Sequence, residues 1–293
     1  MSAHEFLEAT LLERYRSLGN ENEPVWAVHK RNSDEIVKAT IPFIGKNYGE
    51  QSKKILVYAS AENLSGYWKG NTKTWVGDWL DDDLSAENRH RRCFQESIIK
   101  QDSFFPNVHI GPMNDGYLAT AVYYIAAKLY QVDFDNPKNF YETIAFGNYG
   151  KYSIETARQR NARKGVDDVG SNANMDYAGN RELLAVSHDY IRADLEVLNP
   201  DCIIMPKTMY WADKAFIDQN KGNAHIVPIS QMNTRVVNCH IVRMYKGYER
   251  AALPHSVQKW YDELPKGIKA KEKYLSVFTY LDGELEKAVQ QEV

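Results

Sequence analysis

One carboxylate, several amides and a histidine follow short apolar runs of this sequence, at points where a buried strand would end. They are Glu62, Asn63, Asn148, Asn238 and His240. A carboxylate and an imidazole exchange protons near neutral pH, and an amide both donates to and accepts from the edge of a polar ring. These residue types therefore suit acid–base chemistry on a flat, polar ligand.

Four short strands must position these side chains. Apolar runs predict them at residues 54–59, 141–146, 201–206 and 225–229. Runs of this length and composition are typical of strands buried in a parallel sheet. The second run stops at Gly147 and Asn148, and Asn148 suits either a ligand-reading position or a turn. Ligands of open α/β sheets bind at the edge where the carboxyl ends of the strands meet, so we expect the polar side chains to converge there.

Helical periodicity predicts three helices around these strands. Apolar residues recur at helical spacing over residues 5–18 and 115–130, and again between Asn180, a suitable N-cap, and Pro200. The alternation of strands and helices predicts an α/β fold, in which a central, mostly parallel four-stranded sheet is flanked by helices in a three-layer sandwich.

Two basic segments could bind a polyanion. Residues 151–164 hold Lys151, Arg158, Arg160, Arg163 and Lys164 against one acidic residue, and Arg91 lies in a second basic cluster over residues 89–92. The formal net charge of −3 excludes a protein that binds nucleic acid by its overall charge. We therefore expect any phosphate contacts to be local, at Arg158, Arg160, Arg163 and Arg91.

Composition excludes several other classes of protein. The chain has only 3 cysteines and no C-x-x-C pair, so neither a disulfide scaffold nor a four-thiolate metal cluster is expected. An aspartate-rich stretch over residues 78–83 lacks the glycine and the final glutamate of a calcium loop. No glycine-rich phosphate loop and no G-x-S-x-G motif occurs. We expect no metal and no cofactor.

The order of these pieces resembles the uracil-DNA glycosylase-like superfamily. Residues 57–63 (VYASAEN) stand where that family has its first loop, and residues 108–114 (VHIGPMN) resemble its second segment. Residues 144–148 (IAFGN) are similar to its strand ending in asparagine, residues 190–204 to its later helix and strand, and residues 238–240 (NCH) to its histidine loop. The resemblance spans roughly residues 50–245 by order of elements.

The resemblance implies a pocket for a nucleobase that is flipped out of nucleic acid. It assigns catalysis to Glu62, which would orient water, and to His240, which would assist the leaving base. Asn148 and Asn63 would read the base, and His109 would take the position of a stacking aromatic residue. The sequence departs from the family where Ser60 and Ala61 replace acidic residues and where the iron–sulfur cysteines are missing, so no iron–sulfur centre is implied.

The implied function is recognition of a nucleobase, with hydrolysis of its N-glycosidic bond. The alternative is a non-catalytic protein that binds nucleic acid or a nucleotide with the same fold, which Ala61 favours. A third possibility, an unrelated α/β hydrolase, has no nucleophile motif in its support.

We expect one α/β domain over residues 51–245, an N-terminal helical extension over residues 1–50, and a C-terminal helical segment over residues 246–293 packed on the domain. The N-terminus lacks a signal-peptide pattern, and the longest apolar run, near residues 119–127, is shorter than the roughly 20 residues of a membrane span. A cytoplasmic protein without membrane contact is therefore expected.

Overall fold

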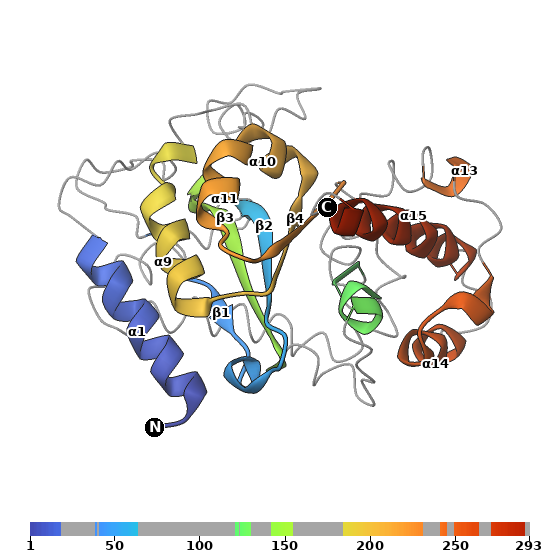
Figure 1. The fold of residues 1–293 in the computed structure, drawn as a ribbon, viewed down its shortest axis with the longest axis horizontal. Coiled ribbons are helices and arrows are strands. Elements are labelled where there is room, and N and C mark those ends of the chain that lie inside the picture. Colours follow the sequence, from blue (N-terminus) through green and yellow to red (C-terminus); the bar gives the residue numbers. More distant parts are fainter. Residues whose placement is uncertain are drawn as a thin grey trace, which may run out of the picture.

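A central sheet between two layers of helices forms the structure, a computed structural model (Figure 1). It describes residues 1–18, 39, 41–63, 121–122, 124–129, 142–154, 184–230, 241–244, 249–263 and 271–290. The predicted α/β class, with a mostly parallel sheet and flanking helices, is confirmed.

The sheet has five strands in the order β1-β3-β2-β4-β5. The four predicted strands are β2 (Ile55–Asn63), β3 (Ile144–Ile154), β4 (Cys202–Pro206) and β5 (His225–Ile229). These four pair in parallel, whereas a fifth strand, β1 (Phe43–Ile44), pairs with β3 in the antiparallel direction. The prediction of four strands missed β1, because its two residues are shorter than the roughly four to eight residues by which a strand is identified in a sequence.

The first two predicted strands end later than the sequence indicated. β2 continues through Asn63 and β3 through Ile154, and the two pair with each other beyond the last contact of β2 with β4, at Val57 and Ile204. Gly147 therefore lies inside a strand and makes no turn. A Cβ atom there would lie 3.0 Å from Cγ of Pro42, so this glycine allows the strand to pass close to the segment that precedes β1.

One face of the sheet is covered by α1 (Ala3–Leu18), α9 (His188–Leu198), α10 (Lys207–Ala212) and α11 (Lys214–Asn220). The first helix confirms the prediction over residues 5–18. α9 begins after Ser187, later than predicted, and the expected cap Asn180 lies outside the described residues. α9 ends as predicted before Pro200, because Asn199 adopts a left-handed conformation with φ of 42°.

The opposite face is covered by α14 (His255–Glu263), α15 (Lys271–Gln290) and the helical residues 121–122 and 124–129. The last of these confirm part of the helix predicted over residues 115–130. Tyr124 stacks on Phe278 of α15 with ring centroids 4.5 Å apart, which joins two of these helices.

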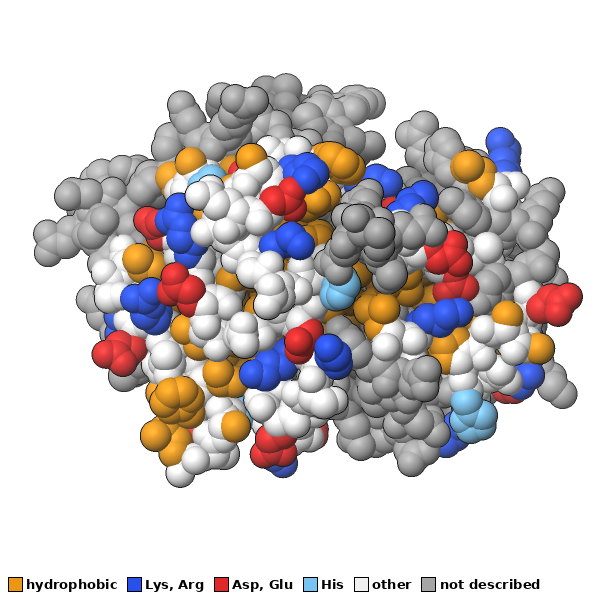
Figure 2. Space-filling model, viewed as in Figure 1, with side chains coloured by type: hydrophobic (Ala, Val, Ile, Leu, Met, Phe, Trp, Pro, Cys, Tyr) orange, Lys and Arg blue, Asp and Glu red, His pale blue; other side chains and the backbone are white. Residues whose placement is uncertain are grey.

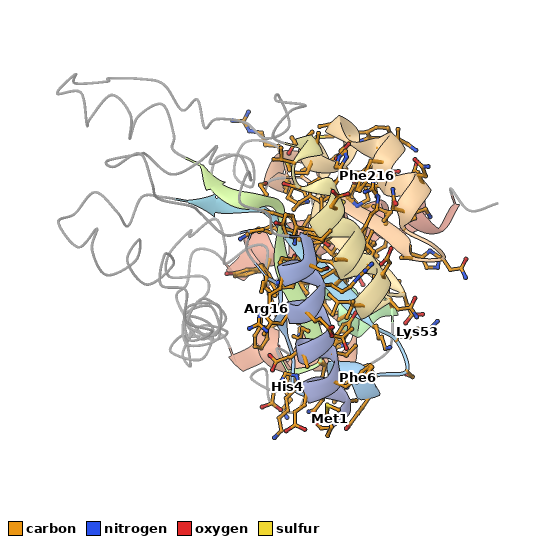
Figure 3. All side chains as sticks on the ribbon, turned by 90° about the vertical axis from the view of Figure 1, so that its left-hand side faces the viewer. Met1, His4, Phe6, Arg16, Lys53 and Phe216 are labelled. Carbon is orange, nitrogen blue, oxygen red and sulfur yellow. The ribbon has the colours of Figure 1, made fainter. Side chains whose placement is uncertain are left out.

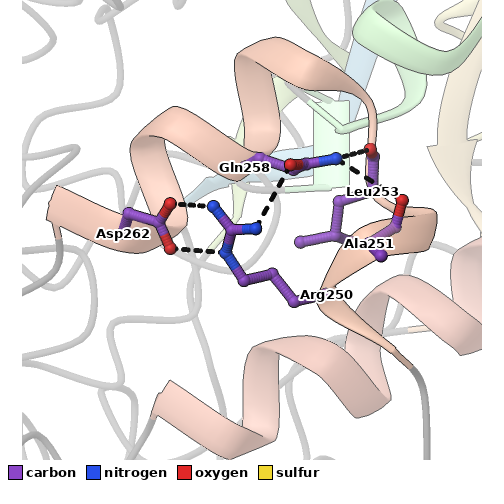
Figure 4. Close-up of polar contacts among 5 residues, drawn as sticks. All are labelled: Arg250, Ala251, Leu253, Gln258 and Asp262. Carbon is purple, nitrogen blue, oxygen red and sulfur yellow. Dashed lines mark hydrogen bonds and ion pairs between the residues drawn. The ribbon is translucent and has the colours of Figure 1, made fainter.

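Three short helical turns complete the described structure: η1 (Tyr48–Glu50), α13 (Val242–Met244) and η5 (Arg250–Ala252). Arg250 connects η5 to α14, because its Nε donates to Oδ1 of Asp262 at 2.6 Å and one terminal nitrogen donates to Gln258 (Figure 4). Gln258 in turn donates to the carbonyl of Leu253 at 2.8 Å. Across the described part of the chain, no helix is both long enough and apolar enough to cross a bilayer.

Candidate functional site at the carboxyl edge of the sheet

Only one predicted site residue has a described side chain. Asn148 lies in the middle of β3, opposite Ala59 of β2, and is partly buried, so it neither forms a turn nor ends a strand. Glu62 and Asn63 lie in β2, where the structure describes their backbone but not their side chains. The other predicted residues lie outside the described part of the chain: His109, His240, Arg91, Arg158, Arg160 and Arg163.

Lys151 does not belong to a surface for phosphate, contrary to its predicted place in a basic loop. It lies in β3, its side chain is fully buried, and its Nζ donates to Oδ2 of Asp194 on α9. The sequence-based interpretation failed here because β3 extends past Asn148 and turns Lys151 toward the layer of α1 and α9.

Asp194 accepts two further hydrogen bonds in the same buried site. The hydroxyl of Tyr15 donates to its Oδ1 at 2.7 Å, and that of Tyr58 donates to its Oδ2 at 2.8 Å. The Nζ of Lys151 also lies 5.7 Å and 5.2 Å from the ring centroids of these tyrosines. Every charged group in this network therefore has partners, which is what a buried ion pair requires.

Burial acts on both members of the ion pair. Loss of hydration lowers the pKa of Lys151, and the charge and hydrogen bond of Asp194 oppose that effect. Loss of hydration likewise raises the pKa of Asp194, against the effect of Lys151 and the two tyrosine hydroxyls. Because the site is closed to solvent and fully paired, we assign it a structural role, linking α1, α9, β2 and β3.

A second chain of polar contacts lies closer to the surface. Oδ2 of Asp213, between α10 and α11, accepts from the hydroxyl of Tyr149 at 2.7 Å and lies 2.7 Å from Nε2 of His188. The three residues come from β3, from the α10–α11 junction and from the first position of α9. Asp213 precedes α11, yet its carboxylate makes no hydrogen bond that caps this helix. It interacts with Tyr149 and His188 instead.

Ring stacking fixes the orientation of His188. Its ring lies parallel to that of Phe216, with centroids 3.6 Å apart and planes 8° apart. Phe216 lies at the end of the molecule opposite Lys53, which comes just before β2, so the histidine is at the carboxyl edge of the parallel strands (Figure 3). The side chain of His188 retains 22% of its exposure, and its ring can therefore reach a ligand.

The same edge carries an exposed aromatic side chain. Trp211 lies on α10, the helix that directly follows β4, and is 55% exposed beside the buried Tyr210. Lys207 at the start of this helix and Lys214 just after it are both partly exposed, although each has an acidic partner. Among the described residues on the face seen in Figure 2, side chains of both charges lie next to one another around this edge and form no large patch of one sign.

α15 contacts this edge of the sheet from the opposite face. Glu284 is nearly buried and lies 3.3 Å from Nζ of Lys207 and 3.0 Å from Nζ of Lys287. The hydroxyl of Tyr280, on the same helix, accepts from the backbone N–H of Ser230 at 2.9 Å, just after β5. These contacts anchor the C-terminal helix at the ends of β4 and β5.

The order of the parallel strands indicates where along this edge a ligand would bind. β2 comes first in the chain but pairs with both β3 and β4, so the connections leave β2 and β4 toward opposite sides. Such a switch in direction opens a crevice beyond the strand ends in α/β proteins. Metal binding has no support within the described ranges, where no group of three or more potential ligands comes together.

Sequence reasoning missed Asp194, Asp213 and His188, and it placed Lys151 in a basic loop. One signal was available, because Asp194 falls on the apolar stripe of α9 at helical spacing from Tyr190, Ile191 and Leu198. A carboxylate on such a stripe indicates a buried partner. Asp213 and His188 left no such signal, since neither directly follows a strand.

Comparisons with known proteins add no relative. No family model, no curated protein and no solved structure matches the chain.

Proposed function

We propose that the protein recognises a nucleobase, in a nucleic acid or a nucleotide, at the carboxyl edge of its sheet. The exposed Trp211 carries this proposal, because it places a flat aromatic surface on the helix that directly follows β4. Bases stack on such side chains with little regard to sequence, and each stacked base stabilises binding by about 1–3 kcal/mol.

The order of elements supports the same function. β2, the helical residues 121–122 and 124–129, β3, α9 and β4 follow one another as in the uracil-DNA glycosylase-like superfamily, which the sequence resembles. In this proposal Arg158, Arg160, Arg163 and Arg91 contact phosphates, while Asn148, Asn63 and His109 contribute to recognition of the base. Neither a metal nor a cofactor is required.

The proposal includes hydrolysis of the N-glycosidic bond, with Glu62 and His240 as the residues suggested by the resemblance. One observation favours the alternative, a protein that binds without cleaving. β2 continues as a strand through Asn63, so the backbone around Glu62 differs from the open loop that the resemblance implies. Binding and cleavage therefore need separate tests.

Binding is tested with a fluorescent single-stranded DNA oligonucleotide that carries one uracil. We expect Trp211→Ala to weaken binding by roughly 5- to 150-fold, the equivalent of losing one stacked base. Phe6→Ala is the matched control, because Phe6 is 56% exposed, close to the 55% of Trp211, but lies at the opposite end of the described fold (Figure 3). Equal affinities for the wild type and Trp211→Ala would remove the basis of the proposal.

Phosphate contacts are tested by varying the salt concentration in the same assay. Arg158→Ala together with Arg160→Ala should lower the affinity and make the dependence of log affinity on log salt less steep, by somewhat less than 1 for each lost contact. An affinity of the wild type that does not change with salt contradicts the assignment of these arginines.

A further inference from the structure

We infer that His188, held by Asp213 and Tyr149, is the proton-transferring residue of this edge, and that it serves hydrolysis of the N-glycosidic bond of the bound nucleobase. The inference rests on the proposed function and deepens it. It assigns proton transfer to His188 in place of Glu62 and His240, because His188 has a defined hydrogen-bonding partner.

The hydrogen bonds define which nitrogen of His188 is available. Nε2 lies 2.7 Å from Oδ2 of Asp213, and an ionised carboxylate only accepts hydrogen bonds. The proton of the neutral ring therefore belongs on Nε2, and Nδ1 keeps its lone pair. The hydrogen bond that the described part of the chain gives this ring uses Nε2, which leaves Nδ1 as the nitrogen for a ligand.

Tyr149 holds the carboxylate from the other side. It is buried, and its hydroxyl donates to the same oxygen that His188 approaches. Burial and the negative charge of Asp213 raise the pKa of Tyr149, so the hydroxyl stays protonated and remains a donor. A base oriented by a carboxylate, which a third group orients in turn, is the arrangement that proton transfer requires.

The surroundings of the ring restrict its motion. Phe216 covers one face of His188, and the guanidinium of Arg192, one turn further along α9, lies 5.2 Å from the centroid of Phe216. Arg192 pairs with Asp189, so the charged groups on the neighbouring turn of α9 balance each other. Asp213 is then the carboxylate that stabilises a positive charge on the ring when His188 accepts a proton.

The proposed reaction adds water across the bond between sugar and base. Nδ1 of His188 takes a proton from water as the water oxygen bonds to C1′ of the sugar. The bond from C1′ to the base nitrogen breaks, and its electron pair leaves with the base. The imidazolium then returns the proton to the departing base, so the histidine ends in its starting state.

The test uses the full-length protein and a single-stranded DNA oligonucleotide that carries one uracil, with abasic sites detected by alkaline cleavage. We expect His188→Gln and Asp213→Asn to lower the rate by about 10²- to 10⁴-fold, the usual range for loss of acid–base catalysis. His188→Gln should also change the pH profile of the rate, because this variant lacks the proton-accepting group. A merely structural role would leave that pH profile unchanged.

His4→Gln is the matched control. His4 also faces a carboxylate, Glu8, at 3.5 Å, and its side chain retains 24% exposure, against 22% for His188. It lies on α1 at the far end from Phe216 (Figure 3). The rate and pH profile of His4→Gln should match those of the wild type.

The outcomes separate the inference from the proposed function. Binding of the oligonucleotide without abasic sites overturns the inference and leaves base recognition standing. Abasic sites formed equally fast by His188→Gln also overturn it. Absence of binding overturns the proposed function and the inference with it.

A measurement on the wild type keeps the inference testable if the variants fail to fold. Nitrogen NMR of the imidazole of His188 should show hydrogen on Nε2 and a bare Nδ1 in the neutral ring. Hydrogen on Nδ1 instead would contradict the assignment.

Discussion

Nζ of Lys151 donates a hydrogen bond to Oδ2 of Asp194 at a site where both side chains are fully buried. The two residues belong to β3 and α9, and two tyrosine hydroxyls complete the set of partners of the carboxylate. The pair stabilises the fold only while both members are present, because a single buried charge keeps its loss of hydration and loses its compensation.

Lys151→Met should lower the free energy of unfolding by about 3–5 kcal/mol near neutral pH, because it leaves Asp194 buried without a cation. Burial raises the pKa of Asp194. The contribution of Asp194 to the stability of this variant should therefore be fully present below its unfolded pKa of about 4. It should be lost as the pH rises through its higher folded pKa. Urea denaturation near pH 5 and pH 8 checks this, with greater stability expected at the lower pH.

Asp194→Asn should give the opposite dependence on pH. Burial lowers the pKa of Lys151, so folding shifts the lysine toward its neutral form relative to the unfolded chain. The contribution of Lys151 to the stability of this variant should be present above its unfolded pKa of about 10.4. It should be lost as the pH falls toward its lower folded pKa. In the wild type, the Lys151–Asp194 pair should give no dependence of stability on pH near neutral pH, because the pair binds one proton in both the folded and the unfolded state. Parallel slopes in the two variants would contradict the burial of the pair.

Tyr15→Phe should destabilise the protein more than Tyr48→Phe does. Both tyrosines are buried hydrogen-bond donors, but Tyr15 donates to the carboxylate of Asp194, whereas Tyr48 donates to the carbonyl of Leu198. Hydrogen bonds to charged groups contribute about 1.5–3 kcal/mol, against about 0.5–1.5 kcal/mol for neutral ones. Urea midpoints of the two variants measure the difference, and a larger loss in Tyr48→Phe would show that the acceptor of Tyr15 is not ionised.

Gly147→Ala should destabilise the protein by about 1–3 kcal/mol, because the new methyl group would meet Pro42 at 3.0 Å within a packed region. Gly283→Ala is the matched control. Gly283 lies within α15, and a Cβ atom there would meet nothing within 4 Å. That variant should gain about 0.5–1 kcal/mol from its better helix propensity. Thermal denaturation of both variants distinguishes a glycine required for close approach from one that is not required.

The parallel sheet was predictable because each of its four parallel strands contains a short apolar run. The ends of β2 and β3 were not, because Ser60 and Asn148 look like loop residues in isolation. Their strand conformation depends on pairing between Ala61 and Gly150, two segments far apart in the chain. Propensity within a single segment carries no information about that pairing.

The candidate site was less predictable than the sheet. Tyr149, Asp213 and His188 are separated by 64 and 25 residues in their two contacts, and each lies on a different element. The rule of inspecting residues directly after each strand finds residues near Lys207, but not the carboxylate of Asp213 six positions further along the chain. The position of Asp213 follows from how α11 packs on α9 and on α10, which only the folded structure defines.

The hydrogen bond from Tyr15 to Asp194 spans 179 residues of sequence. During synthesis, which proceeds from the N-terminus, α1 leaves the ribosome long before its partner carboxylate is made. The docking of α1 can therefore be completed only after α9 has been synthesised. Until then, α1 lacks the contacts with α9 that help to bury its apolar side, which includes Leu11 in the folded protein.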